Sequence, residues 1–235
     1  MMATTHGLAG LAVALAALAV AGVAPGSELG LLVLAAGAGG GVFPDADLYT
    51  GHRRRLHFPT VYPVVATGAA VVAVFAPSAA ILTAAVFLAA AALHCGMDVL
   101  GGGLELRPWR ETSDRAVYDH VRGRWLRPRR WVRYDGAPED LALAGAFAAP
   151  ALLTTAGPVR AVAIAALGVS AVYVALRRPI ARLTGILASY APAPVGAHLP
   201  ERFHEAERVH EAERVHDAER ATGTEGTRRP SSQQG

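Results

Sequence analysis

Residues 79–98 read AAILTAAVFLAAAALHCGMD, and this stretch decides how the chain folds. No Asp, Glu, Lys or Arg precedes Asp98 in it, and its length matches the ~20 residues that an apolar helix needs to cross a bilayer. It ends on His94 and Asp98, ionisable residues of a kind that is costly at membrane depth. The stretch therefore predicts a membrane helix with functional candidates at one end.

Five further apolar blocks surround this stretch. Of the 235 residues, 52% are hydrophobic and 17% are charged, and the charges are concentrated outside the blocks. No Lys or Arg precedes the first block, so we expect a retained helix there and not a cleaved signal peptide. The expected fold class is all-α, an integral membrane helical bundle of about six transmembrane helices. The six blocks are Gly7–Ala24, Leu29–Phe43, Thr60–Ala76, Ala79–Met97, Leu141–Ala156 and Val159–Leu176.

The arginines predict the orientation, since loops rich in Lys and Arg stay on the cytoplasmic side of a membrane. All 22 basic residues are Arg. The connections after the second, fourth and sixth blocks carry fifteen of them, whereas the opposite connections carry only Arg160. We therefore expect a multi-pass protein of the cell membrane with both termini in the cytoplasm.

Four regions follow from this organisation. The loop between the fourth and fifth blocks holds all three tryptophans among nine arginines, a mixture that suits the lipid headgroup layer. Within it, Asp114–Leu126 is expected to form an amphipathic helix on the membrane. The C-terminal tail, residues 183–235, repeats a His-(Glu/Asp)-Ala-Glu-Arg motif from His204, and we expect it to be disordered or a solvated helix. The regions are a membrane-embedded core at 1–98, the cytoplasmic Arg/Trp-rich loop at 99–140, the last two spans at 141–182, and a polar low-complexity tail at 183–235.

Composition also limits the partners and the cofactors. A net charge of only +3, together with the membrane helices, argues against a nucleic-acid partner. Membrane lipids and a small-molecule or lipid substrate are the expected partners. Cys95 is the one cysteine, so the chain can form neither an internal disulfide nor a thiolate zinc cluster. A metal site must therefore be built from histidines and carboxylates.

Ionisable residues at the cytoplasmic ends of the predicted spans supply such ligands. His94 and Asp98 are four residues apart and share a helix face. Asp45 and Asp47 are two residues apart and, in an extended segment, would aim at one point. The expected cofactor is a divalent metal, with zinc preferred. The expected metal ligands are His6, Asp45, Asp47, His94 and Asp98; His57 and His52 are expected to act catalytically, by moving protons or holding a phosphate oxygen, and His57 is a candidate ligand as well.

Each of these residues also has a purely structural explanation. His6 suits a helix cap, Pro-Asp-Ala-Asp suits a capping turn, and His94 with Asp98 suits a packed polar pair. A different functional class stays open: an ion-coupled transporter, or a scaffold with a structural metal. The run Gly37–Gly41 favours a transporter, because it could unwind the second span, whereas a structural metal would have a closed ligand shell.

Four motifs follow one another over roughly residues 1–110. They are Thr5-His6-x-x-x-Gly10, Phe43-Pro44-Asp45-Ala46-Asp47, His52-Arg53 leading to His57, and His94-x-x-x-Asp98 followed by Leu106-x-Pro108-Trp109. In this order they resemble the YdjM-like (LexA-binding, inner membrane-associated) predicted membrane-bound metal-dependent hydrolases. The chain departs from the family pattern Arg-Gly-x-Thr-His-Ser: it keeps His57 but lacks the hydroxyl-bearing neighbours.

The resemblance implies a multispan inner-membrane protein with a His/Asp metal centre and a distant relation to zinc-dependent phospholipase C. The expected function is a membrane-bound metal-dependent hydrolase that acts on a phosphoester or lipid-linked substrate at the cytoplasmic membrane face. Arg53, Arg54 and Arg55 suit either the anionic oxygens of such a substrate or anchoring in the headgroup layer.

Overall fold

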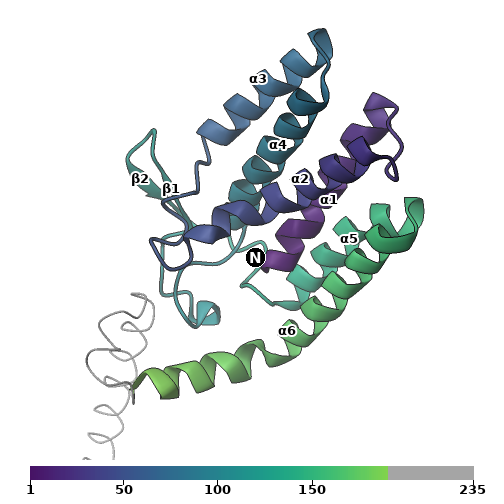
Figure 1. Ribbon diagram of the computed structural model, residues 1–235. Helices are drawn as coiled ribbons and strands as arrows, with labels where there is room; N and C mark the ends of the chain where they lie inside the picture. The colour runs from purple at the N-terminus through teal and green to yellow at the C-terminus, as the bar shows by residue number, and fades with distance from the viewer. Residues whose placement is uncertain (190–235) are drawn as a thin grey trace, which may run out of the picture. The chain divides into compact units, whose positions relative to one another are not determined.

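The computed structural model describes residues 1–189, and six α-helices account for most of them. Each predicted apolar block falls on one of these helices, which confirms the helical part of the prediction (Figure 1). The helices are α1 (Ala3–Ala21), α2 (Glu28–Val42), α3 (Val61–Phe75), α4 (Ala79–Leu100), α5 (Pro138–Thr154) and α6 (Gly157–Ser189).

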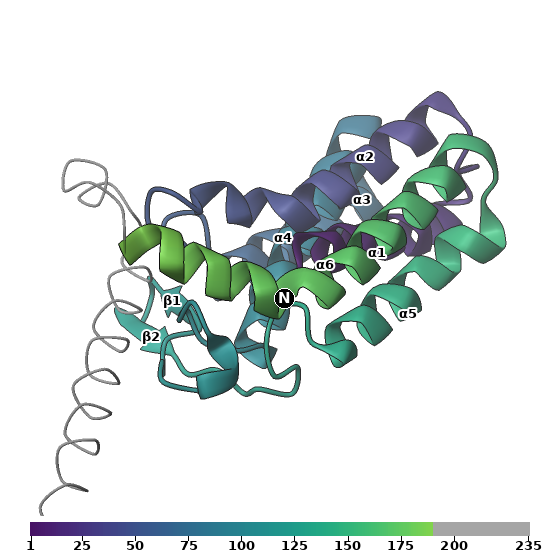
Figure 2. The same cartoon turned by 90° about the horizontal axis from the view of Figure 1, so that it is seen from below.

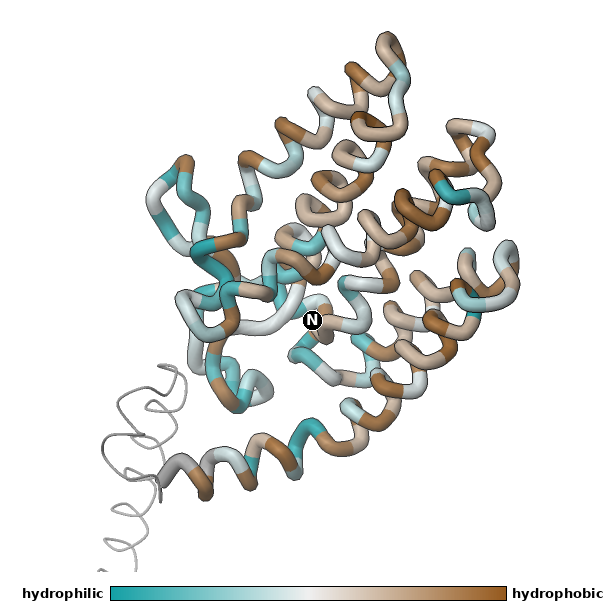
Figure 3. Tube along the Cα trace, viewed as in Figure 1, coloured by the Kyte–Doolittle hydropathy of each residue, from teal (hydrophilic) through white to brown (hydrophobic). Residues whose placement is uncertain are grey.

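Helix length and apolar composition are sufficient for membrane crossing in four segments of the described chain. These are Ala3–Ala21, Glu28–Asp47, Ala79–Leu100 and Gly157–Thr184. α3 is apolar too, but its 15 residues are fewer than a helix perpendicular to the membrane needs. Apolar residues line the helices, and hydrophilic residues gather in the loops at one end of them (Figure 3).

α1 packs against α2, α4 and α5, and glycines let it approach α2 closely. A Cβ atom at Gly10 would lie 2.0 Å from the Gly37 carbonyl oxygen, and one at Gly41 would lie 2.2 Å from the His6 carbonyl oxygen. Small residues at such contacts are typical of helices that pack in lipid. α2 stays helical through Gly37–Gly41. The run is therefore a packing surface and not the unwound segment that favoured a transporter.

The chain divides into two compact units. One comprises Met1–Leu104 and Pro108–Pro179, and the other comprises, of the described residues, Glu105–Arg107 and those from Ile180 to Ser189. The first unit contains the buried apolar core and all the candidate site residues. Of the predicted tail, residues 183–189 belong to α6, and the motifs that begin at His204 lie outside the described residues.

The prediction of an amphipathic helix over Asp114–Leu126 is wrong. The structure has an antiparallel hairpin there, β1 (Val117–Asp119) paired with β2 (Arg124–Leu126). Asp119 starts the turn by accepting a hydrogen bond from the Val121 N–H, and Gly123 supplies the positive φ of 62° near its end. Turn chemistry and the valine and aromatic residues of this segment therefore outweigh its helical pattern. The hairpin also departs from a purely α-helical fold.

The up-and-down course of the first four helices brings distant segments to one end of the bundle. The start of α1, the end of α2, the following loop and the end of α4 meet there (Figures 1 and 2). A short 3₁₀ turn, η1 (Phe43–Asp47), continues α2 into that loop, and a second one, η2 (Pro108–Arg110), lies beyond α4. The segments that carry the predicted site residues thus lie together.

Candidate metal centre

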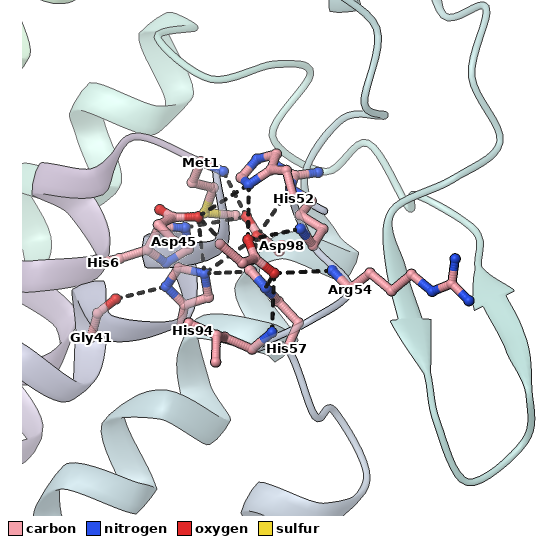
Figure 4. A network of polar contacts seen from close by, with 12 residues as sticks. Met1, His6, Gly41, Asp45, His52, Arg54, His57, His94 and Asp98 are labelled. Atoms are coloured by element: carbon pink, nitrogen blue, oxygen red, sulfur yellow. Dashed lines mark hydrogen bonds and ion pairs between the residues drawn. The ribbon is translucent and has the colours of Figure 1, made fainter. Parts of the chain in front are cut away.

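Four residues bring one ligand atom each to a common point at this end of the bundle. Asp45 lies on η1, His57 in the loop before α3, and His94 and Asp98 on the last turns of α4. Their ligand atoms all lie within 4.8 Å of one another. Figure 4 shows these side chains pointing toward one another from the three segments.

The spacing of these atoms fits a tetrahedral metal. His57 Nε2 lies 3.1 Å from His94 Nε2, and Asp98 Oδ2 lies 3.5 and 3.4 Å from the two nitrogens. Asp45 Oδ1 lies 3.5 Å from His94 Nε2 and 3.9 Å from His57 Nε2. Zinc ligands at 2.0–2.2 Å in a tetrahedron are separated from one another by about 3.3–3.6 Å. The distances of 3.4 and 3.5 Å fall in this range, and those of 3.1 and 3.9 Å lie close to it, so the group is near the size of a metal-ligand shell.

Hydrogen bonding at the far ring nitrogens decides what the two histidines present to the centre. His57 Nδ1 lies 3.1 Å from Asp47 Oδ2, and His94 Nδ1 lies 2.6 Å from the Gly41 carbonyl oxygen. A carboxylate and a carbonyl only accept, so each Nδ1 carries the proton and donates it. In the neutral rings both Nε2 atoms then present lone pairs. With both rings neutral, four electron-pair donors converge at one point, which is an arrangement that a cation stabilises.

The burial of the ligand residues also favours a bound cation. His57, His94 and Asp98 are each at most 1% exposed. Asp98 Oδ2, one of the four ligand atoms, accepts no hydrogen bond from the described residues, although the Arg53 Nε atom lies 3.1 Å away as an ion-pair partner. A buried carboxylate oxygen without a hydrogen bond is costly, and a bound metal ion would compensate for that cost.

Asp47 lies outside the group of four and holds its surroundings instead. Its carboxylate accepts hydrogen bonds from the backbone N–H groups of Arg53, Arg54 and Leu56, as well as from His57. The orientation of His57 is thus set by a carboxylate, although the hydroxyl neighbours of the family pattern are missing. Ligand histidines are commonly oriented in this way in metalloproteins.

The different positions of Asp45 and Asp47 follow from the local backbone. The prediction that both would aim at one point assumed an extended segment, and η1 is a 3₁₀ turn. A 3₁₀ helix has three residues per turn, so side chains two residues apart point in directions that differ by about 120°. Asp45 therefore faces the ligand group while Asp47 faces the loop.

His6 also lies beside the group and not in it. Its Nε2 atom is 3.2 Å from Asp98 Oδ1, and its ring stacks on the His94 ring with centroids 3.8 Å apart. The Met1 nitrogen donates to the same Asp98 oxygen at 2.9 Å. His6 and Met1 therefore hold the Asp98 oxygen that faces away from the two Nε2 atoms.

The centre is open to the outside only near Asp45 and His52 among the described residues that surround it. The Asp45 side chain is 21% exposed and that of His52 is 19% exposed. His52 Nδ1 lies 3.4 Å from Asp47 Oδ1 and 3.9 Å from Asp45 Oδ1. Burial lowers the pKa of His52 more than the contact with Asp47 raises it. A neutral imidazole thus lies on the open side.

The hairpin braces the loop that carries His57. The Tyr118 N–H donates to the Arg53 carbonyl oxygen at 2.9 Å, and the Thr60 hydroxyl donates to Asp119 Oδ2 at 3.0 Å. Burial by itself raises the pKa of Asp119, but hydrogen bonds from Thr60 and Arg122 hold that pKa below its usual value. The carboxylate is therefore ionised at neutral pH and keeps both partners.

The three neighbouring arginines differ in their surroundings. Arg53 is buried, and its Nε lies 3.1 Å from Asp98 Oδ2. Arg54 and Arg55 are exposed. The Arg54 guanidinium lies 4.7 Å above the Tyr118 ring and extends away from the centre (Figure 4). Only Arg53 of the three reaches the ligand group.

The structure thus places Asp45, His94, Asp98 and His57 in one group, and His6, Asp47 and His52 in contact with it. Sequence reasoning missed the Gly41 carbonyl, and it assigned Arg53 to a substrate or to the headgroup layer and not to Asp98. The glycine run and an arginine directly after His52 were the available signals.

Comparisons of the chain with protein-family models, with curated proteins and with solved structures found no match.

Proposed function

We propose that this chain is a membrane-bound, metal-dependent hydrolase that cleaves a phosphoester of an amphiphilic or lipid-linked substrate at the cytoplasmic membrane face. The observation that carries the proposal is the convergence of the His57 and His94 Nε2 atoms with the carboxylate oxygens of Asp45 and Asp98. Buried nitrogen and oxygen ligands at this spacing suit zinc. The motifs that resemble the YdjM-like hydrolases support the same chemistry.

The open side of the group is where a reaction would take place. A divalent metal held there supplies Lewis acidity, since it lowers the pKa of a bound water and polarises a phosphoryl oxygen. Asp45 is the ligand residue on this side, and His52 lies next to it. His52 is therefore proposed to exchange protons with the reacting water, while the buried ligands stay fixed.

Apolar side chains beside Asp45 support an amphiphilic substrate. Phe43 is 39% exposed and Tyr49 is 83% exposed, and both lie within four residues of Asp45. This end of the segment Glu28–Asp47 would lie at a membrane surface. A polar head group could then reach Asp45 while its apolar part stays beside Phe43 and Tyr49. Membrane lipids of the inner leaflet have this chemistry.

A scaffold with a structural metal is the second candidate. Four protein ligands fill a tetrahedral zinc shell, and a closed shell is typical of structural zinc. The partial exposure of Asp45 favours the hydrolase, because a ligand next to solvent is the one that gives way to water or substrate. The two candidates predict different results for turnover but the same result for metal content.

The hydrolase is tested with purified, zinc-loaded protein in detergent against three phosphoesters: bis(p-nitrophenyl) phosphate, a short-chain phospholipid and a long-chain phospholipid. We expect turnover by the wild type, with the phospholipids preferred over the soluble ester. Asp45→Asn should lower the rate by roughly 10²-fold or more, because it weakens the ligand on the open side. Asp114→Asn removes an exposed carboxylate outside the site and should change nothing. Metal retained without any turnover would favour the scaffold.

The proposed topology has six spans and cytoplasmic termini, and reporter fusions test it. Fusions after Ala76 and after Gly157 should report the outside, and a fusion after Arg182 should report the inside, because the arginine-rich connections stay in the cytoplasm. A reporter that requires the cytoplasm and one that requires the outside should give opposite readings at each position. A cytoplasmic signal after Ala76 would contradict the topology.

A further inference from the structure

Arg53 has a backbone conformation that arginine rarely adopts. Its φ is 59°, in the left-handed region where residues other than glycine are strained. Two hydrogen bonds hold it there: its N–H donates to Asp47 Oδ1 at 3.2 Å, and its carbonyl accepts from the Tyr118 N–H at 2.9 Å. Strain of this kind persists only where the surrounding structure requires it, and it concentrates at functional sites.

The side chain of Arg53 is buried against the ligand group. Its Nε lies 3.1 Å from Asp98 Oδ2, and its Nη1 donates to the Gly102 carbonyl oxygen at 2.9 Å. Asp98 Oδ2 is the carboxylate oxygen that also lies within 3.5 Å of the His57 and His94 Nε2 atoms. Burying a guanidinium is expensive unless it is paired, so a role only in membrane orientation does not explain this position.

We propose that Arg53 is a positioning residue of the metal centre, which turns the Asp98 carboxylate toward His57 and His94 and balances its charge. This inference rests on the proposed metal centre. Anchored at Gly102, the guanidinium fixes the position of Asp98 Oδ2 from one side, while His6 holds Oδ1 from the other. Hydrogen-bonded and ion-paired neighbours of metal ligands fix the geometry of those ligands.

The charges of the side chains agree with this role. The carboxylates of Asp45, Asp47 and Asp98 carry three negative charges. Asp47 contacts His57, and both Asp45 and Asp98 contact His94. The Arg53 guanidinium and the Met1 ammonium, both in contact with Asp98, carry two positive charges, so one negative charge is left for a bound cation to balance. A buried site of this kind is stable when its charges are matched. Arg53 thus acts on the centre itself, whereas Arg54 and Arg55 face outward.

Arg53→Gly removes the whole side chain, guanidinium included, and keeps the backbone turn, because glycine accepts the left-handed conformation without strain. Zinc affinity is measured by competition with a chelator of known affinity, and Co²⁺ is substituted to record the visible spectrum of the centre. We expect Arg53→Gly to bind zinc about 10–100-fold more weakly and to shift the Co²⁺ bands. Arg53→Lys keeps the charge but cannot reach both Asp98 and Gly102, so it should recover part of the affinity.

Arg54→Gln and Arg55→Gln are the matched controls, since they remove exposed charges from the same loop. Both should keep wild-type affinity within about twofold. Wild-type affinity and an unchanged Co²⁺ spectrum in Arg53→Gly would overturn the role of Arg53 and leave the metal centre standing. Tighter zinc binding would overturn it as well, because Arg53 would then compete with the metal for Asp98. Wild-type protein that binds no metal would overturn both proposals.

Discussion

A protein that carries His94→Ala and Asp98→Ala is expected to retain less than roughly a tenth of the zinc that the wild type retains, which should be about one ion per chain. Both residues lie on the last turns of α4, and each supplies one of the four converging atoms. Their removal leaves His57 and Asp45, and two ligands do not hold zinc against dialysis. Metal content is measured by elemental analysis of purified protein in detergent.

Two controls make this result specific. His204, His210 and His216 are replaced by Gln in every protein, and the purification tag contains no histidine, so that weak binding elsewhere does not add to the signal. His120→Ala with Asp114→Asn removes one histidine and one carboxylate outside the group of four and should keep the full metal content. Equal zinc in the wild type and in the His94/Asp98 variant would exclude this centre. Thermal unfolding shows whether each variant is folded.

Gly41→Ala is expected to disrupt the metal centre although glycine is not a ligand. A Cβ at this position would lie 2.2 Å from the His6 carbonyl oxygen, so α1 and α2 must move apart. Overpacking of this kind costs about 1–3 kcal/mol. The same movement displaces the Gly41 carbonyl that accepts from His94 Nδ1 and the His6 ring that stacks on His94. We expect a lower unfolding temperature together with weaker zinc binding.

Gly39→Ala is the matched control, because it makes the same chemical change two residues earlier in the same helix. Apart from its own stretch of helix, no atom lies within 4 Å of a Cβ at Gly39, so the substitution fits without movement. It should keep the zinc affinity of the wild type and keep or slightly raise the unfolding temperature, because alanine favours a helix more than glycine does. If the two variants behaved alike, close packing of α1 on α2 would not be what positions His94.

Much of this architecture can be read from local composition. Long apolar blocks must bury their backbone polar groups within helices if they enter a bilayer, so six blocks predict six helices. The spacing of four between His94 and Asp98 predicts a shared helix face, and the two side chains do lie 3.4 Å apart. The 3₁₀ turn at Phe43–Asp47 and the hairpin at Val117–Leu126 were missed, because short segments depend on turn contacts with the rest of the chain.

The sequence by itself determined the apolar helices, the polar residues at their ends and the choice of histidine and carboxylate as the available metal ligands. Composition and periodicity are local properties, so they can be read without a partner. Only the tertiary structure decided which of these residues share one point, because that depends on how closely α1, α2 and α4 approach at Gly10, Gly37 and Gly41. It also brought Arg53 against Asp98, a contact between residues 45 positions apart that no local pattern encodes.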